Sequence, residues 1–133
     1  MVRLDGIISS NGTTGEIEDQ NLFKHSLSLE QVKKIVKLAQ QQHIYYEVFP
    51  FGAQRIVLKE DYQWMRDMIT GETPPNNVSH SEWTSRLDAM KDKIDWRDEL
   101  PDLDYSKIYL FNPNLDKITT FRDELIQNKV LLS

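Results

Sequence analysis

The glycines of IISSNGTTGEI, the stretch from Ile7 to Ile17, are the first feature whose spacing could serve phosphate chemistry. A Walker loop needs Gly, four residues and then Gly-Lys-Ser/Thr, because the lysine and the hydroxyl contact phosphate and magnesium. Here Gly12 and Gly15 are three positions apart, and Glu16 follows in place of lysine. Asn-Gly followed by Thr-Thr-Gly is typical of a tight turn. The stretch therefore predicts a hairpin or a strand end.

The pair Asp102-Leu-Asp104 has the Asp-x-Asp pattern of phosphatases that use an aspartate nucleophile. Such a nucleophile projects from the C-terminal end of a buried strand, where backbone amides and magnesium converge. Here the two aspartates follow Leu-Pro and precede the apolar run at 106–111, which is the reverse order. A solvated acidic connector over 95–104 is therefore the expected structure.

Histidine and cysteine provide no recognisable metal or nucleophile pattern. His25, His43 and His80 follow no ligand spacing, and the chain has no cysteine. His43 is expected in the last turn of a helix, where a cation complements the helix dipole. No catalytic residue and no metal ligand is predicted in this chain. The three tryptophans, Trp64, Trp83 and Trp96, are expected in the core or at its edge.

Glu47 and Arg55 interrupt two otherwise apolar runs, IYYEVFPF at 44–51 and AQRIVLK at 53–59. Aromatic and β-branched residues favour strands, and the Pro-Phe-Gly between the runs predicts a hairpin. Two interpretations of the polar pair stay open. It is either a cross-strand ion pair on an exposed sheet face or part of a sheet surface that meets a ligand or another domain.

Helical periodicity predicts the elements that position these residues. A helix within 26–43 has apolar side chains at helical spacing and a capping box of Ser28 and Gln31 at its start. A short helix is expected from an Asp61 cap to Gly71. A third begins with a capping box of Ser79 and Glu82, and a fourth spans 112–129. The inward-facing residues are predicted to be Val32, Ile35, Val36, Ala39, Trp83, Leu87, Met90, Ile118, Phe121 and Leu125.

Strands interleaved with these helices predict an α/β fold of the α+β type. The simplest architecture is an open-faced two-layer sandwich, in which helices pack on one face of a mixed or antiparallel sheet. The opposite face would be more open. The last four residues, VLLS at 130–133, are expected to begin a further strand.

Charge and hydropathy limit the classes of partner. The 133 residues carry a formal net charge of -5, which repels phosphate backbones, so no nucleic-acid partner is expected. No apolar run is long enough for a signal peptide or a membrane span. The chain is therefore expected to be cytoplasmic, with no membrane partner.

The order of these elements resembles the middle of Cof-type phosphatases of the haloacid dehalogenase-like superfamily. In that family a strand ending in Ser-Asn-Gly, here Ser10 to Gly12, leaves the catalytic core. A hairpin with a Gly-Glu turn follows, and then a helix that begins Leu-Ser-x-Glu, here at 27–30. The chain then builds a cap domain before it returns to the core. The residue after Asn-Gly is usually alanine and is Thr13 here.

The resemblance implies a cap of type IIB over 15–133 and a junction with the catalytic core over 1–14. The nucleophilic aspartates, the residue that holds the phosphoryl group, the lysine and the magnesium site of the family have no counterpart in this chain. They are expected in the missing core, so magnesium is expected for the parent protein, and this chain alone is expected to be inactive.

The partners implied are the chain's own catalytic core and a phosphorylated small-molecule substrate. The substrate-binding residues implied are Asn11 and Gly12, near the hinge, with Glu47 and Arg55 on the sheet. The alternative is a free-standing α/β regulatory module that binds a small molecule or a protein.

Overall fold

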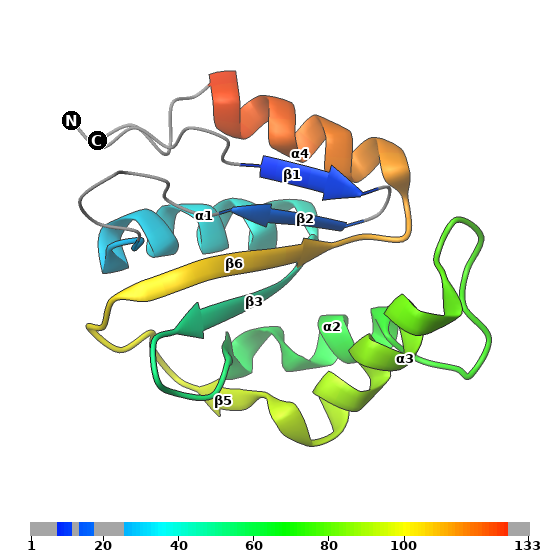
Figure 1. Ribbon diagram of the computed structural model, residues 1–133, viewed down its shortest axis with the longest axis horizontal. Helices are drawn as coiled ribbons and strands as arrows, with labels where there is room; N and C mark the ends of the chain where they lie inside the picture. Colours follow the sequence, from blue (N-terminus) through cyan, green and yellow to red (C-terminus); the bar gives the residue numbers. More distant parts are fainter. Residues whose placement is uncertain (1–7, 12–13, 18–25, 128–133) are drawn as a thin grey trace.

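A computed structural model describes residues 8–11, 14–17 and 26–127 of the chain (Figure 1). The first half contains β1 (Ile8–Asn11), β2 (Thr14–Ile17), α1 (Leu29–Gln42), β3 (Tyr45–Pro50), β4 (Ile56–Leu58), the 3-10 turn η1 (Lys59–Asp61) and α2 (Tyr62–Met68). The second half contains α3 (His80–Asp88), the π-helical segment η2 (Ala89–Lys93), β5 (Asp95–Arg97), β6 (Tyr105–Phe111) and α4 (Leu115–Gln127).

The strands form a six-stranded sheet in the order β1-β2-β6-β3-β4-β5. Four of the strand pairings are antiparallel, and β4 with β5 is parallel, so the predicted mixed sheet and α/β class are confirmed. β1 and β2 are antiparallel, with Asn11 opposite Thr14, which confirms the hairpin prediction for the opening stretch. Gly12 and the segment 130–133, where a strand was expected to begin, lie outside the described residues.

The first long helix forms where its caps predict. Ser28 and Gln31 make the predicted capping box, in which each side chain accepts a hydrogen bond from the backbone N–H of the other. His43 lies just beyond the helix, in the left-handed region at φ 55°, rather than in its last turn. Its ring stacks on Trp64 with centroids 5.1 Å apart, so this residue packs α1 against α2.

The core lies mainly between the sheet and the pair α1 and α4, which cover the same face (Figure 1). The inward-facing residues predicted for these two helices are all buried, which confirms both periodicities. α2 lies beside α1. Asp61, which directly precedes α2, accepts a hydrogen bond from Gln40 of α1 at 2.8 Å. Among the described residues, no helix is long and apolar enough to cross a membrane.

α3 contacts the opposite face of the sheet. Side chains alternate along a strand, so Tyr45 and Glu47 share one face of β3, opposite Phe111 and Tyr109 of β6. The Trp83 ring of α3 lies 6.4 Å from the Phe111 ring. The predicted one-sided arrangement therefore describes α1, α2 and α4, whereas α3 covers one end of the other face.

Two predicted elements need correction. The connector over 95–104 contains a strand, because Asp95–Arg97 pairs in parallel with Ile56–Leu58. Backbone pairing at a sheet edge does not require apolar side chains, and charged residues are common there. The third helix is α-helical only to Asp88 and continues as a π-helical segment to Lys93.

The capping predictions for Asp61 and Glu82 are also only partly met. Asp61 stands at the start of α2 but makes no side-chain cap hydrogen bond, and α2 ends at Met68, before Gly71. The Ser79 hydroxyl accepts from the Glu82 backbone N–H, as predicted. The Glu82 carboxylate does not return the bond, since it instead accepts a hydrogen bond from the Tyr109 hydroxyl.

Candidate functional site

Glu47 is a fully buried carboxylate at the centre of β3. Its Oε1 accepts a hydrogen bond from Arg55 Nη1 at 2.9 Å. Its Oε2 accepts from the Tyr45 hydroxyl at 2.5 Å and from Arg86 Nη1. Removing a carboxylate from water costs several kcal/mol unless such partners replace the water. The pair of Glu47 with Arg55 therefore exists, but its carboxylate lies beneath the surface of the sheet rather than on it.

Arg86 comes from α3 and joins Glu47 to Glu82. Its Nε lies 3.2 Å from Glu82 Oε1, and its guanidinium carbon lies 4.1 Å from the centre of the Tyr109 ring. Burial by itself would lower the pKa of Arg86, but the charge of Glu47, with Tyr45 and Glu82, raises that pKa. The guanidinium therefore stays charged inside the protein.

Burial also shifts the pKa of two further groups of this cluster, Tyr45 and Glu82. Burial, together with the Glu47 carboxylate, raises the pKa of Tyr45, so its hydroxyl remains a hydrogen-bond donor. Burial also raises the pKa of Glu82, and the charges of Glu47 and Glu16 act in the same direction. Arg86 opposes that rise without cancelling it.

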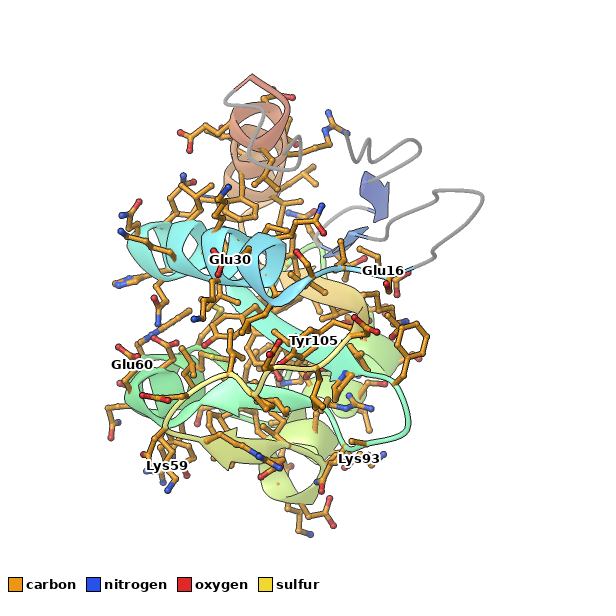
Figure 2. The ribbon with its side chains drawn as sticks, turned by 90° about the vertical axis from the view of Figure 1, so that its left-hand side faces the viewer. Glu16, Glu30, Lys59, Glu60, Lys93 and Tyr105 are labelled. Atoms are coloured by element: carbon orange, nitrogen blue, oxygen red, sulfur yellow. The ribbon has the colours of Figure 1, made fainter. Side chains whose placement is uncertain are left out.

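The cluster meets solvent around Phe49, two residues further along β3. Arg55 Cζ lies 4.8 Å from the centre of the Phe49 ring, and Lys107 Nζ lies 5.1 Å from it. Their side chains are 24% and 32% exposed, so both cations are accessible from the sheet face. Lys107 also pairs with Glu16 on β2 at 3.1 Å. In Figure 2, Glu16 and Lys93 lie on one side of the molecule, and Glu30 and Glu60 lie on the other.

A hollow of about 360 Å³ lies next to Arg55. One side chain spans its rim, because Gln54 Nε2 donates to the backbone carbonyl of Asp92 at 3.4 Å. That contact joins the loop after β3 to the π-helical segment. The residues around the hollow are Phe49, Ala53, Gln54, Arg55, Asp92 and Lys93.

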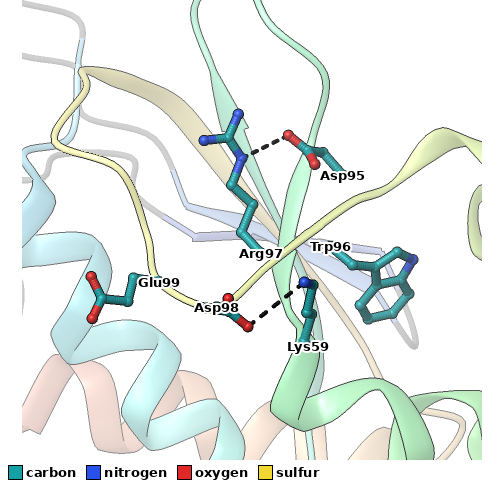
Figure 3. Close-up of a pocket in the computed structure, with 6 residues that line it drawn as sticks. All are labelled: Lys59, Asp95, Trp96, Arg97, Asp98 and Glu99. Atoms are coloured by element: carbon teal, nitrogen blue, oxygen red, sulfur yellow. Dashed lines mark hydrogen bonds and ion pairs between the residues drawn. The ribbon is translucent and has the colours of Figure 1, made fainter.

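A larger hollow of about 580 Å³ lies along β5 and is shown in Figure 3. Both of its cations are already paired, Arg97 with Asp95 at 2.8 Å and Lys59 with Asp98 at 3.7 Å. Three acids and two bases line it, with Glu99 as the third acid. Its greater size therefore does not make it the better site for an anion.

Comparison with known families identifies the chain. A family model described as haloacid dehalogenase-like hydrolase matches residues 1–132. The chain belongs to the haloacid dehalogenase-like hydrolase family. The resemblance to the Cof-type phosphatases of this superfamily is thus confirmed. No curated protein matches the chain.

The residues predicted to bind substrate do not form one cluster in this member of the hydrolase family. Glu47 and Arg55 are in contact. Asn11 ends β1, which β2 and β6 separate from β3. The strand register puts Asn11 level with Tyr45 at the far side of the sheet. Gly12 lies outside the described residues.

Arg86, Tyr109 and Lys107 of the charged cluster were not singled out from the sequence, and Glu82 was predicted only as part of a helix cap. Glu82 and Arg86 could have been noted as an acid and a base four positions apart on a helix. Nothing local connects Arg86 with Glu47, which is 39 positions away in the chain. Tyr109 and Lys107 belong to β6, whose sequence is that of an ordinary strand and gives no sign of a site.

Magnesium, which the hydrolase family implies, does not fit the residues described. Among them, no group of three or more histidine, aspartate or glutamate side chains could hold a metal ion. The exposed Asp102 and Asp104 lie in the segment between β5 and β6, as expected of a solvated connector. Metal chemistry is therefore not assigned to these side chains.

Proposed function

We propose that this chain is the substrate-specificity cap domain of a magnesium-dependent phosphatase of the family, acting on small phosphorylated metabolites. The observation that carries the proposal is the charged cluster on the sheet face that α1, α2 and α4 leave uncovered. On that face Arg55 and Lys107 are held in place and are partly exposed. A surface of ordered, accessible cations suits a ligand that carries phosphate.

The proposal divides the work between two domains. The catalytic core, with its magnesium, performs the phosphoryl transfer. The cap, residues 15–133, closes over the substrate, excludes water and contacts the part of the substrate that is not transferred. Residues 1–14 form the junction, with Asn11 and Gly12 near the hinge.

Within the cap, Arg55 is the residue proposed to touch substrate. Glu47 has no exposed surface, and its oxygens already accept hydrogen bonds from Tyr45, Arg55 and Arg86. Glu47 therefore acts as a positioning residue, because it fixes the Arg55 guanidinium at the edge of the open face.

A phosphatase assay tests the cap role. The purified chain, mixed with p-nitrophenyl phosphate and Mg²⁺, should release no p-nitrophenol above the buffer rate, since the nucleophile and the metal site belong to the core. Asp102→Asn is the companion variant. Robust turnover by the wild-type chain would overturn the proposal, whether that turnover survives Asp102→Asn or is lost with it.

The reading frame of the gene separates the cap from the free-standing module. A frame that continues upstream of the Met1 codon and encodes Asp-x-Asp would support the cap. A natural start at Met1 with a stop codon directly after Ser133 would favour the independent binding module instead.

A further inference from the structure

The hollow beside Phe49 gathers positive charge in an acidic protein. The chain has a formal net charge of -5. The hollow is nevertheless lined by two bases, Arg55 and Lys93, and one acid, Asp92. Lys107 adds a third cation on the same aromatic ring. The side chains that line the hollow thus carry a formal charge of +1, and Glu47 and Glu16 offset the charges of Arg55 and Lys107.

Arg55 is fixed in advance for an incoming anion. Its Nη1 donates to Glu47 at 2.9 Å, and its guanidinium lies over the Phe49 ring. A guanidinium has five N–H donors, so this contact leaves others for a ligand. Because buried Glu47 and the ring already hold the side chain, little rotamer freedom remains to be lost on binding.

Lys93 is the second cation, and it is available. Its side chain is exposed at the end of the π-helical segment, and no described residue forms a hydrogen bond or an ion pair with it. The Gln54 contact to the Asp92 carbonyl ties this segment to the loop that precedes Arg55. Both cations therefore line one hollow, although the Asp92 carboxylate, which also lines it, weakens the attraction of the hollow for anions.

From this geometry we infer that the hollow between Arg55 and Lys93 is an anion subsite for a single phosphate or carboxylate group. A charge-assisted hydrogen bond from a planar guanidinium suits either oxyanion, and the ammonium of Lys93 adds a point charge. The volume of about 360 Å³ accommodates such a group with the adjoining part of a small metabolite.

The subsite narrows the substrate class, and this step rests on the proposed function. In a phosphatase of this kind, the phosphate that is cleaved is held by the catalytic core. An anion in the cap hollow is then a second one, which the reaction leaves intact. The substrate is therefore a small metabolite that carries a phosphate or a carboxylate in addition to the phosphate removed.

A titration of the full chain tests the subsite directly. Inorganic phosphate and malonate, added separately to the ¹⁵N-labelled chain, should give saturable NMR shifts at Gln54, Arg55 and Lys93. Glucose, which is neutral, should give none. Added NaCl should weaken both anions, because the cations are partly exposed.

Lys93→Gln is the decisive variant, since Lys93 is exposed and its loss should not disturb the fold. It should weaken binding of the anions about threefold to tenfold, the loss of one charge-assisted contact. Lys59→Gln removes the same charge beside the larger hollow, where Lys59 is exposed, and should leave the affinity unchanged.

Each outcome decides the inference. The subsite is supported if either anion binds saturably and if Lys93→Gln weakens that binding while Lys59→Gln does not. The anion that binds more tightly then shows whether the subsite prefers a phosphate or a carboxylate. Absence of saturable shifts, or equal affinity in Lys93→Gln and the wild-type chain, overturns it. Such a failure leaves the cap proposal standing, because the phosphatase assay and the reading frame test that role separately.

Discussion

Two buried carboxylates, Glu47 and Asp61, lie on opposite faces of the sheet at β3 and have different kinds of hydrogen-bond donor. Glu47 is 0% exposed, and Asp61 is 4% exposed. Glu47 accepts hydrogen bonds from two guanidinium groups and from Tyr45. Asp61 accepts from neutral donors, which are the Gln40 amide, the Tyr46 hydroxyl and the Trp64 indole.

The alternation of side chains along the strand creates this contrast. Tyr45 and Tyr46 are neighbours in sequence, so they face opposite sides of the sheet, and each serves one carboxylate. Asp61 lies under α1 and α2, where its neutral donors fix the position of the two helices. The charge on Glu47 is balanced by arginines, and one of them, Arg55, reaches solvent. The helix-covered cluster thus stabilises the fold, whereas the cluster on the open face also presents a cation.

The largest effect should follow from Glu47→Gln. The substitution keeps the shape of the side chain but leaves Arg86, which is nearly buried, without its closest counter-charge. Removing one partner of a buried ion pair costs about 3–5 kcal/mol, so the free energy of unfolding in urea should fall by that amount.

A double variant controls for the cause of that loss. Arg86→Met removes the guanidinium charge that Glu47→Gln leaves unpaired. The double variant should therefore recover part of the lost free energy of unfolding, because replacing both partners of a buried ion pair by uncharged residues is often neutral. A loss below about 1 kcal/mol for Glu47→Gln alone would contradict the picture of a dehydrated ion pair.

Asp61→Asn should have a smaller effect. The amide keeps one acceptor oxygen but points its NH₂ group at donors from Gln40, Tyr46 or Trp64. At least one buried donor then lacks a partner, which costs about 1–3 kcal/mol. Urea unfolding of this variant beside Glu47→Gln measures the difference between neutral and charged partners. Equal losses would show that the arginines contribute nothing special.

The two tyrosines allow a matched comparison within the sheet. The Tyr46 hydroxyl donates to Asp61 and accepts from the Leu58 backbone N–H at 3.2 Å, so Tyr46→Phe leaves the Leu58 N–H without this partner and removes one of the three donors to Asp61. Tyr45→Phe leaves Glu47 with both of its arginines. We expect Tyr46→Phe to cost about 1–2 kcal/mol and Tyr45→Phe about 1 kcal/mol or less, measured by urea unfolding. The reverse order would mean that Tyr45 is essential to the charged cluster.

The sequence predicts the local parts of this fold and misses the contacts that join them. The periodicity of 29–42, the Ser28 capping box and the hairpin of β3 with β4 depend on neighbours in the chain, and all three are confirmed. Aspartate is a residue type typical of helix caps, which is why Asp61 was predicted as one. Its side chain instead accepts hydrogen bonds from Tyr46 and Gln40, which lie 15 and 21 positions away in the chain. No local pattern contains that information.

The candidate site was predicted in the same partial way. Glu47 and Arg55 stood out because polar residues interrupt two apolar strands, and they are indeed paired. The burial of Glu47 could not be predicted, since it depends on α3 crossing the second face and placing Arg86 there. The hollow beside Phe49 likewise needs Lys93, which is 38 positions after Arg55 and comes close only through the fold.

The smallest expected effect is a pH dependence that comes from Glu82. Because burial raises the pKa of Glu82, the folded protein binds this proton more tightly than the unfolded chain does. Its contribution to stability is fully present below the unfolded pKa, near 4.3, and is lost as pH rises through the folded pKa. Glu82→Gln cannot titrate, so its free energy of unfolding, relative to wild type, should increase between about pH 4 and pH 7.

The size of that increase should stay below about 1 kcal/mol, since the Glu82 side chain is 25% exposed and Arg86 compensates part of the burial. Glu30→Gln, which removes an exposed carboxylate from the start of α1, is the control for the change in net charge. Urea unfolding of the three proteins at several pH values gives the comparison. If the stability of Glu82→Gln instead falls relative to wild type as pH rises, the attraction of Arg86 for the Glu82 carboxylate outweighs the effect of burial on the pKa of Glu82.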